Sequence, residues 1–230
     1  NGPGARLVPM KIAQAGFTSF SSKDGLPGPY CVSFLLDRAG HLYATTHTRG
    51  TETVLSRLEA SPFPAIRVNV PPRIKGRGWG GAQLTLQDHL GDWWVPTGEG
   101  LVRFSGIRKT EDLATAIPSA IYTVKDELPS SEIYRLFEDS RGDLWVIAYG
   151  LARYDRATGR FEKLSGIGPN ALGEDAAGNV WIGGWDGDLT RYRDGRLERF
   201  IESDGVPRGT IAVIFRDSHN RLWIGSTLPR

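Results

Sequence analysis

The sequence predicts an all-β protein, a β-propeller built from four-stranded blades. Three observations lead to this fold class: a motif that recurs five times, the spacing of its copies, and the strand patterns around it. Each copy begins with Asp, has Gly or Asn three residues later, and continues into a short apolar segment. The copies start at Asp37, Asp88, Asp139, Asp175 and Asp217, at intervals of 51, 51, 36 and 42 residues. Such intervals are typical of propeller blades, so about five blades are expected.

Each copy opens with a predicted tight turn between two strands. The Asp side chain can accept hydrogen bonds from backbone amides of the turn, and Gly three residues later adopts a positive φ without a steric clash. The fifth copy has Asn220 in place of Gly. Because Asn is the next residue most tolerant of that conformation, this substitution supports the turn.

The segment after each turn is apolar on both faces, which is typical of a strand buried between stacked blades. We expect the large aromatic residue at the sixth position after each Asp to lie in the core. These segments are residues 42–44, 93–95, 144–146, 180–182 and 222–224.

Three further strands complete the predicted blade. The strands before the turn are predicted at residues 32–36, 83–86, 133–137 and 211–215, the third strands at 55–58, 101–104, 151–154 and 189–192, and the fourth strands at 65–70, 120–124, 161–164 and 197–201. Every third strand alternates apolar and polar residues around an Arg, so one face should be more exposed. We expect this Arg to be solvated or to bridge two blades.

Composition and motifs exclude several classes of function. A net charge of +2 over 230 residues is too small to indicate a nucleic-acid partner. Cys31 is the single cysteine, so no intramolecular disulfide can form. The sequence has no run of 18 apolar residues, no phosphate-binding loop and no metal-binding His or Cys motif. Neither a catalytic residue, a metal nor a cofactor is therefore predicted.

The ends of the chain suggest a piece of a longer protein, since there is no initiator Met and the fifth repeat stops after its second strand. We expect residues 1–16 to form an N-terminal segment or linker and residues 17–230 to form the propeller repeats. An unclosed propeller leaves strand edges and one blade face exposed, which predicts self-association.

A short segment recurs between repeats. It reads Lys23-Asp24-Gly25-Leu26-Pro27, Lys125-Asp126-Glu127-Leu128-Pro129 and Ser203-Asp204-Gly205-Val206-Pro207. Together with Asp-x-x-Gly-x-Leu-Trp-Ile-Gly and Gly-Leu-x-Arg-Tyr-Asp, it resembles the two-component regulator propeller repeat from about Phe17 onward. This sequence departs from the pattern at Tyr43, which replaces Trp, and at Glu127, which replaces Gly. The segment is also missing before the second and fourth copies.

The resemblance implies a seven-bladed propeller in the extracytoplasmic, periplasmic sensor region of a bacterial signalling protein such as a hybrid histidine kinase. The segment itself would not be an enzyme. It would bind a small molecule or an oligosaccharide, or pair as a homodimer, and bias output domains outside this chain; any membrane contact would also come from outside it. Two alternatives stay open, a constitutive protein-interaction scaffold and a small propeller lyase, for which His47 and Glu99 are the candidates.

Loop lengths indicate the ligand-binding face. From the repeat Asp to the Leu of the third strand the offsets are 18, 13, 12 and 14, so the loop between the second and third strands varies. Alternating strands place this loop on the same rim as the connection to the next blade, where an insertion at residues 71–81 also falls. Its cations and aromatic ring suit anionic or sugar-like ligands. The candidate ligand-binding residues are Arg73, Lys75, Arg77 and Trp79 in this insertion, and Tyr149 and Trp185 at hairpin tips.

Overall fold

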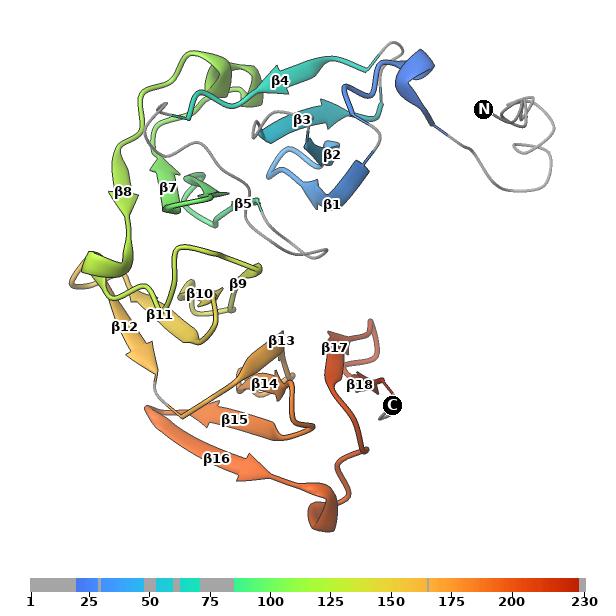
Figure 1. Ribbon diagram of the computed structural model, residues 1–230, viewed down its shortest axis with the longest axis vertical. Helices are drawn as coiled ribbons and strands as arrows, with labels where there is room; N and C mark the ends of the chain where they lie inside the picture. Colours follow the sequence, from blue (N-terminus) through green and yellow to red (C-terminus); the bar gives the residue numbers. More distant parts are fainter. Residues whose placement is uncertain are drawn as a thin grey trace, which may run out of the picture.

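The computed structural model describes residues 20–28, 30–47, 53–59, 63–70, 85–164 and 166–227, with backbone alone for Tyr30 and His47. Within these ranges five antiparallel sheets follow one another along an arc (Figure 1). Four of them have four strands, the fifth has two, and the only helices are short 3₁₀ turns. The all-β propeller architecture is thus confirmed. The total of seven blades and the separate segment at residues 1–16 stay predictions.

Each sheet is a meander of consecutive strands. Blade 1 contains β1 (Tyr30–Leu36), β2 (Leu42–His47), β3 (Thr53–Arg57) and β4 (Ala65–Arg67). Blade 2 contains β5 (Leu86–Gln87), β6 (Trp93–Thr97), β7 (Gly100–Phe104) and β8 (Ala120–Tyr122). Blade 3 contains β9 (Arg135–Glu138), β10 (Leu144–Ile147), β11 (Leu151–Asp155) and β12 (Arg160–Leu164). Blade 4 contains β13 (Pro169–Glu174), β14 (Val180–Gly184), β15 (Leu189–Arg193) and β16 (Arg196–Phe200), and blade 5 contains β17 (Ile211–Arg216) and β18 (Leu222–Ser226).

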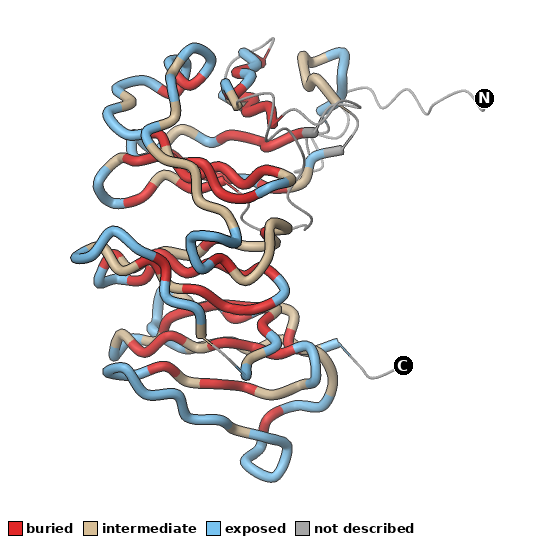
Figure 2. Tube along the Cα trace, turned by 60° about the vertical axis from the view of Figure 1, so that its left-hand side comes forward, coloured by how far each residue is buried: buried red, intermediate tan, exposed pale blue. Residues whose placement is uncertain are grey.

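The core lies between the sheets. Buried residues concentrate in the middle of the strands, whereas the turns at both rims are exposed (Figure 2). The second strands are predicted well, but the fourth strands of blades 1 and 2 are shorter than expected. The strand β13 was not predicted because its sequence carries little apolar bulk. A Cβ atom on Gly173 would lie 2.5 Å from Cγ2 of Ile214, so the neighbouring blade fills the space that a side chain would take.

The predicted turn is confirmed in all five copies. The amide of the residue three positions after each Asp donates to the Asp carbonyl oxygen at 2.9–3.1 Å, and that residue has a positive φ. The fifth turn is closed by Asn220 at a φ of 62°. The Asp side chain also accepts backbone N–H groups of the turn, as Asp139 does from Arg141 and Asp143.

The same Asp holds the core aromatic residue, which the sequence analysis did not predict. In copies two to five its Oδ2 accepts the indole Nε1–H of the Trp six positions later, at 2.8–3.0 Å. The indole of Trp223 is the main reason that the pKa of Asp217 falls from 3.8 to about 2. Trp94 and Trp145 are fully buried, as predicted. For Trp223 that prediction is wrong, because the side chain is 54% exposed on a face of blade 5 that no described residue covers.

The first copy replaces this contact with one from the next blade. Tyr43 is buried at the Trp position, but Oδ2 of Asp37 accepts from Oγ1 of Thr110 at 3.3 Å and lies 3.1 Å from Nδ1 of His41. Thr110 begins the 3₁₀ helix η3 (Thr110–Ala114), within a long loop between β7 and β8. Burial alone raises the pKa of Asp37, but the hydrogen bonds from His41 and Thr110 outweigh it and the net shift is downward. The indole donor that is missing at Tyr43 is therefore replaced by Thr110 of the next blade and by His41.

The third strands are more buried than predicted. Their apolar and small residues are buried, and only the Arg and the strand ends have partial exposure. Two of these Arg residues bridge neighbouring blades, which was one of the two roles expected for them. Nη1 of Arg103 donates to the Tyr154 hydroxyl at 3.2 Å, and the Arg153 guanidinium lies 5.4 Å from the ring centroid of Tyr192. The expectation of an exposed face was wrong because blades 2, 3 and 4 each contact a neighbouring sheet on both faces.

A repeated hydrogen bond joins neighbouring blades at the turn. The residue before the Asp of one blade accepts the backbone N–H of the residue after the Asp of the preceding blade. Gln87 accepts from Arg38 at 2.9 Å, Glu138 accepts from His89 at 2.9 Å, and Glu174 accepts from Ser140 at 3.0 Å. This interblade contact couples residues that are 34 to 49 positions apart, so pattern analysis of single repeats did not reveal it.

The inter-repeat segments form three equivalent 3₁₀ turns, η1 (Ser22–Asp24), η4 (Val124–Asp126) and η5 (Glu202–Asp204). Each is followed by a residue in the left-handed region: Gly25 at a φ of 101°, Glu127 at 68° and Gly205 at 89°. Only Glu127 carries a Cβ that makes this conformation unfavourable, at a cost of about 1–2 kcal/mol.

We therefore expect Glu127→Gly to stabilise the protein by about 0.5–1 kcal/mol, since relief of the left-handed strain exceeds the entropy that Gly adds to the unfolded chain. The free energy of unfolding from urea titration checks this. The reverse change, Gly205→Glu at the equivalent position, should destabilise by a similar amount. Equal stabilities of all three proteins would contradict the argument from backbone strain.

Candidate functional site

The two sets of loops that the sequence places on one rim do lie together among the described residues. The hairpins between second and third strands lie against the connections from one blade to the next. A Cβ on Gly150 would lie 2.9 Å from Cβ of Pro129, and the hydroxyl of Thr210 donates to the carbonyl oxygen of Trp185 at 2.8 Å. The alternation of strand direction thus places both sets of loops on one rim, as the sequence analysis predicted.

A cavity of about 850 Å³ opens on this rim where blade 4 meets blade 5. It is formed by the β14–β15 hairpin, by the connection that contains η5, and by the residue after β18. We call it the rim cavity. Its lining residues are Trp185, Asp186, Gly187, Asp188, Ile201, Glu202, Pro207, Arg208, Gly209, Thr210 and Thr227.

Trp185 is held by its backbone while its ring is free. Its N–H donates to the carbonyl oxygen of Gly168 at 3.0 Å, and its own carbonyl accepts from Thr210. Two residues on, Gly187 has a φ of 87°, and a Cβ there would lie 3.0 Å from the carbonyl oxygen of Gly209. The hairpin therefore packs closely on the connection, whereas the Trp185 side chain stays 57% exposed. An exposed indole on a fixed backbone can stack on a ligand at a small entropic cost.

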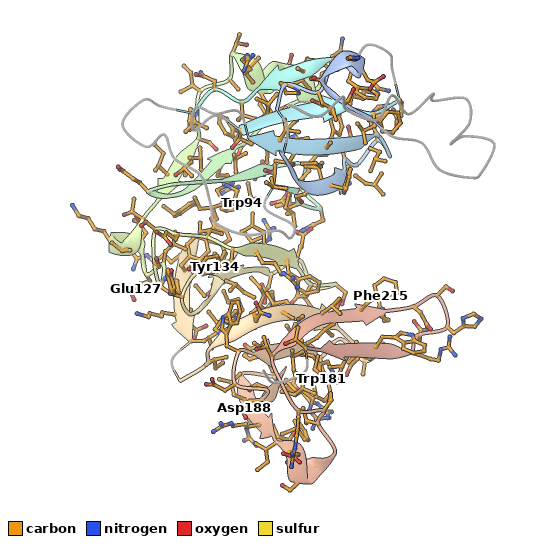
Figure 3. The ribbon with its side chains drawn as sticks, turned by 45° about the vertical axis from the view of Figure 1, so that its right-hand side comes forward. Trp94, Glu127, Tyr134, Trp181, Asp188 and Phe215 are labelled. Atoms are coloured by element: carbon orange, nitrogen blue, oxygen red, sulfur yellow. The ribbon has the colours of Figure 1, made fainter. Side chains whose placement is uncertain are left out.

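The rim cavity is rich in hydrogen-bond acceptors. Its charged lining residues are the carboxylates of Asp186, Asp188 and Glu202 and the guanidinium of Arg208. Arg208 is engaged by Glu202, with 2.6 Å between Nε and Oε1. Asp188, labelled in Figure 3, is paired with Arg199 of β16. Carboxylates repel an anion but accept hydrogen bonds from hydroxyl groups, so this cavity suits a neutral polyhydroxylated ligand better than an anionic one.

Tyr149 forms a second exposed aromatic position on the rim. It lies between β10 and β11 with a φ of 43°, is 75% exposed, and packs edge-to-face on Tyr134 at 5.0 Å between ring centroids. Burial, followed by the neighbouring Tyr149, raises the pKa of Tyr134. Tyr149 does not belong to the lining of the rim cavity, so the structure does not unite the two aromatic candidates in one cavity.

The other candidate residues fall elsewhere. Arg73, Lys75, Arg77 and Trp79 lie outside the described residues, as does the side chain of His47. Glu99 is exposed at the tip of the hairpin between β6 and β7. Within the described parts of the chain no three metal-ligating side chains come together, and no helix is long and apolar enough to cross a membrane.

The sequence pattern did not indicate four residues of the rim cavity's lining, Asp188, Glu202, Arg208 and Thr210. They belong to segments that meet only because blade 5 stacks on blade 4. One signal was available, since the third inter-repeat segment, at residues 203–207, lies among them.

Residues 127–150 match the model of the two component regulator propeller family. This segment is a two-component regulator propeller repeat. The repeat covers β9 and β10 of blade 3, including the Asp139 turn and Trp145, and so confirms the predicted resemblance. None of the curated proteins is similar enough in sequence to be matched.

Solved structures share the propeller fold with this chain at low sequence identity. The extracellular domain assigned to a hybrid two-component system of B. thetaiotaomicron is 19% identical, with a TM-score of 0.63 over 91% of this chain and 29% of that one. A second extracellular domain from B. thetaiotaomicron, assigned to a one-component system, is 19% identical, with a TM-score of 0.68 over 91% of this chain and 28% of that one. This chain therefore spans less than a third of either domain.

An enzyme shares the fold as well. Virginiamycin B lyase from Staphylococcus aureus is 16% identical, with a TM-score of 0.61 over 84% of this chain and 62% of the lyase. At such identities the likeness shows the architecture alone, because one propeller scaffold supports many functions.

Proposed function

We propose that this chain is part of the ligand-sensing propeller of a bacterial two-component signalling protein, on the periplasmic side of the membrane. The observation that carries the proposal is the rim cavity with its exposed Trp185, on a chain that contains a regulator propeller repeat. The two similar domains from B. thetaiotaomicron are extracellular, which supports an extracytoplasmic location. The output module would be a histidine kinase, simple or hybrid, encoded outside this chain.

The ligand that the rim cavity suits is an oligosaccharide. One face of a sugar ring would stack on Trp185, and its hydroxyl groups would donate to Asp186 and Asp188. The volume of about 850 Å³ is large enough for more than one sugar unit.

Signal transfer follows from the position of the cavity between two blades. Because the lining comes from the β14–β15 hairpin of blade 4, from the connection to blade 5 and from the residue after β18, a ligand would bind most tightly to one relative arrangement of these blades. It would shift the population toward that arrangement and thereby bias the output domains, or a homodimer partner, without chemistry in the propeller.

The two alternatives make different demands. A lyase needs a His beside an acid, and the described lining of the rim cavity has acids but no His; the likeness to virginiamycin B lyase supports this alternative at the level of fold only. A constitutive scaffold would bind a protein partner on a broad face and would show no affinity for small ligands.

Isothermal titration calorimetry with neutral oligosaccharides (malto-, xylo- and arabino-oligosaccharides) tests the proposal. We expect one of these to bind, and Trp185→Ala to weaken that binding about tenfold or more, as for a stacked aromatic anchor. Ile117→Ala is the matched control, because Ile117 is an exposed apolar residue in the β7–β8 loop, away from the rim cavity. Equal affinity of all three proteins, or no binding of any oligosaccharide to the wild type, would contradict the proposed sensor site.

A further inference from the structure

A second cavity, of about 740 Å³, lies between blades 1 and 2. It is formed by the Asp37 turn of blade 1 and by the long β7–β8 loop of blade 2. Both belong to the rim opposite the rim cavity, because they join strands at the other end of each sheet. We call it the junction cavity. Its charged lining residues are Asp37, Arg38, Arg57, Arg108, Lys109 and Glu111.

At the next junction, between blades 2 and 3, the cation in the equivalent place is paired with carboxylates of the protein. Arg156, in the turn after β11, donates through Nη2 to Oδ2 of Asp88 at 3.0 Å and to Oε1 of Glu138 at 2.9 Å. Its side chain is only 18% exposed. At this junction the guanidinium of Arg156 therefore pairs with two carboxylates of the protein itself.

At the junction of blades 1 and 2 neutral residues take over these contacts. Gln87 occupies the position of Glu138 and accepts the Arg38 N–H. Thr110 reaches Asp37 where Arg156 reaches Asp88. The junction thus has one carboxylate fewer, and its Asp is satisfied by Thr110 and His41 instead of by an Arg.

Of the four cations in the lining of this cavity, two are engaged within the described part of the chain and two are not. Arg57 is paired with Glu59 at 2.9 Å, and Nη1 of Arg38 donates to the carbonyl oxygen of His89. Arg108 and Lys109, adjacent in the long loop and both exposed, make no side-chain hydrogen bond or ion pair with the described part of the chain. The lining of the cavity therefore carries four cations against two carboxylates, those of Asp37 and Glu111, so positive charge is in excess.

We propose that the junction cavity binds an anion of the phosphate or sulfate class, held by Arg108 and Lys109. A guanidinium can bind two oxygens of a tetrahedral oxyanion side by side, and an ammonium group adds a third charge-assisted hydrogen bond. The cavity is larger than a bare oxyanion, so the anion can be free in solution or part of a phosphate or sulfate ester. This site is separate from the rim cavity and does not depend on the function proposed for it.

Calorimetric titration of the full chain at low ionic strength tests the site. The probes are inorganic phosphate, inorganic sulfate and glucose 6-phosphate, with glucose as the uncharged reference. We expect at least one anionic probe to bind and glucose not to bind, and we expect the affinity to fall as salt is added. The double variant Arg108→Gln/Lys109→Gln should weaken binding by about tenfold or more, since hydrogen bonds to charged groups are lost.

A second double variant controls for net charge. Lys163→Gln/Arg196→Gln removes two exposed cations from blades 3 and 4, outside the junction cavity, and should keep wild-type affinity. Stronger binding of glucose 6-phosphate than of the inorganic ions assigns the site to an ester, and equal binding assigns it to the free ion. No binding of any anionic probe, or equal losses in the two double variants, overturns the proposal. Circular dichroism checks that both variants are folded.

Discussion

Trp94→Ala is expected to lower the free energy of unfolding by about 3–5 kcal/mol, the usual cost of removing a fully buried aromatic side chain. The indole of Trp94, labelled in Figure 3, is completely inaccessible and joins two blades. It stacks on Tyr122 of its own blade and packs edge-to-face on Tyr154 of blade 3, with centroid distances of 5.7 and 5.1 Å. The Arg103 guanidinium lies over its ring at 5.4 Å. Its removal opens a cavity at the contact between two sheets.

Urea denaturation monitored by circular dichroism measures the effect. Trp223→Ala is the matched control, because Trp223 makes the same indole contact with Asp217 but is half exposed. It should cost much less, since there is little packing to lose. Trp94→Phe keeps most of the packing but leaves Asp88 without the indole donor, so an intermediate loss is expected. Equal losses for Trp94→Ala and Trp223→Ala would show that packing between blades is not the main contribution.

Asp88→Ala should destabilise the protein by about 3–5 kcal/mol, because it leaves several buried donors without their acceptor and removes one of the two carboxylates that Arg156 contacts. The Asp88 side chain is fully buried. Its Oδ1 accepts the N–H groups of Leu90 and Asp92, and its Oδ2 accepts Nε1 of Trp94 and Nη2 of Arg156. One carboxylate thus stabilises the turn, the core aromatic residue and the junction with blade 3.

Asp217→Ala tests whether burial sets this cost. Asp217 accepts the equivalent turn amides and the Trp223 indole, but its donors are exposed and water can replace the carboxylate. We expect a clearly smaller loss there. A double-mutant cycle of Asp88→Asn with Arg156→Met isolates the interblade pair, and a coupling energy near zero would refute its contribution.

Much of the fold could be predicted because the repeat motif encodes local geometry. A turn that needs a positive φ selects Gly, or Asn as at Asn220, and a strand covered on both faces selects apolar residues such as those around Trp145. These requirements act within about ten residues of each other, so they recur in every copy. Trp185 could be predicted as a candidate ligand residue for a similar reason, because an aromatic residue at a hairpin tip has no role in the turn.

Where the prediction failed, the cause lies in contacts between blades. The strand β13 has small residues because Ile214 of the next blade occupies the space beside Gly173. Trp223 occupies the core position of the repeat motif, but it is exposed because no described residue covers that face of blade 5. The acids of the rim cavity, Asp188 and Glu202, come from separate segments and converge only when blades 4 and 5 stack.

By itself, the sequence determined the all-β class, the period of the blades, the five turns and the rim on which the variable hairpins lie. Hydrogen bonding and side-chain patterns along a single strand or turn are sufficient for each of these. Only the tertiary structure decided which charges are matched. Arg156 is neutralised by Asp88 and Glu138, whereas Asp37 is satisfied by Thr110 and leaves Arg108 and Lys109 without a partner among the described residues. The physical reason is that a charge's partner is set by distance in space, and stacking of blades brings together residues that lie tens of positions apart.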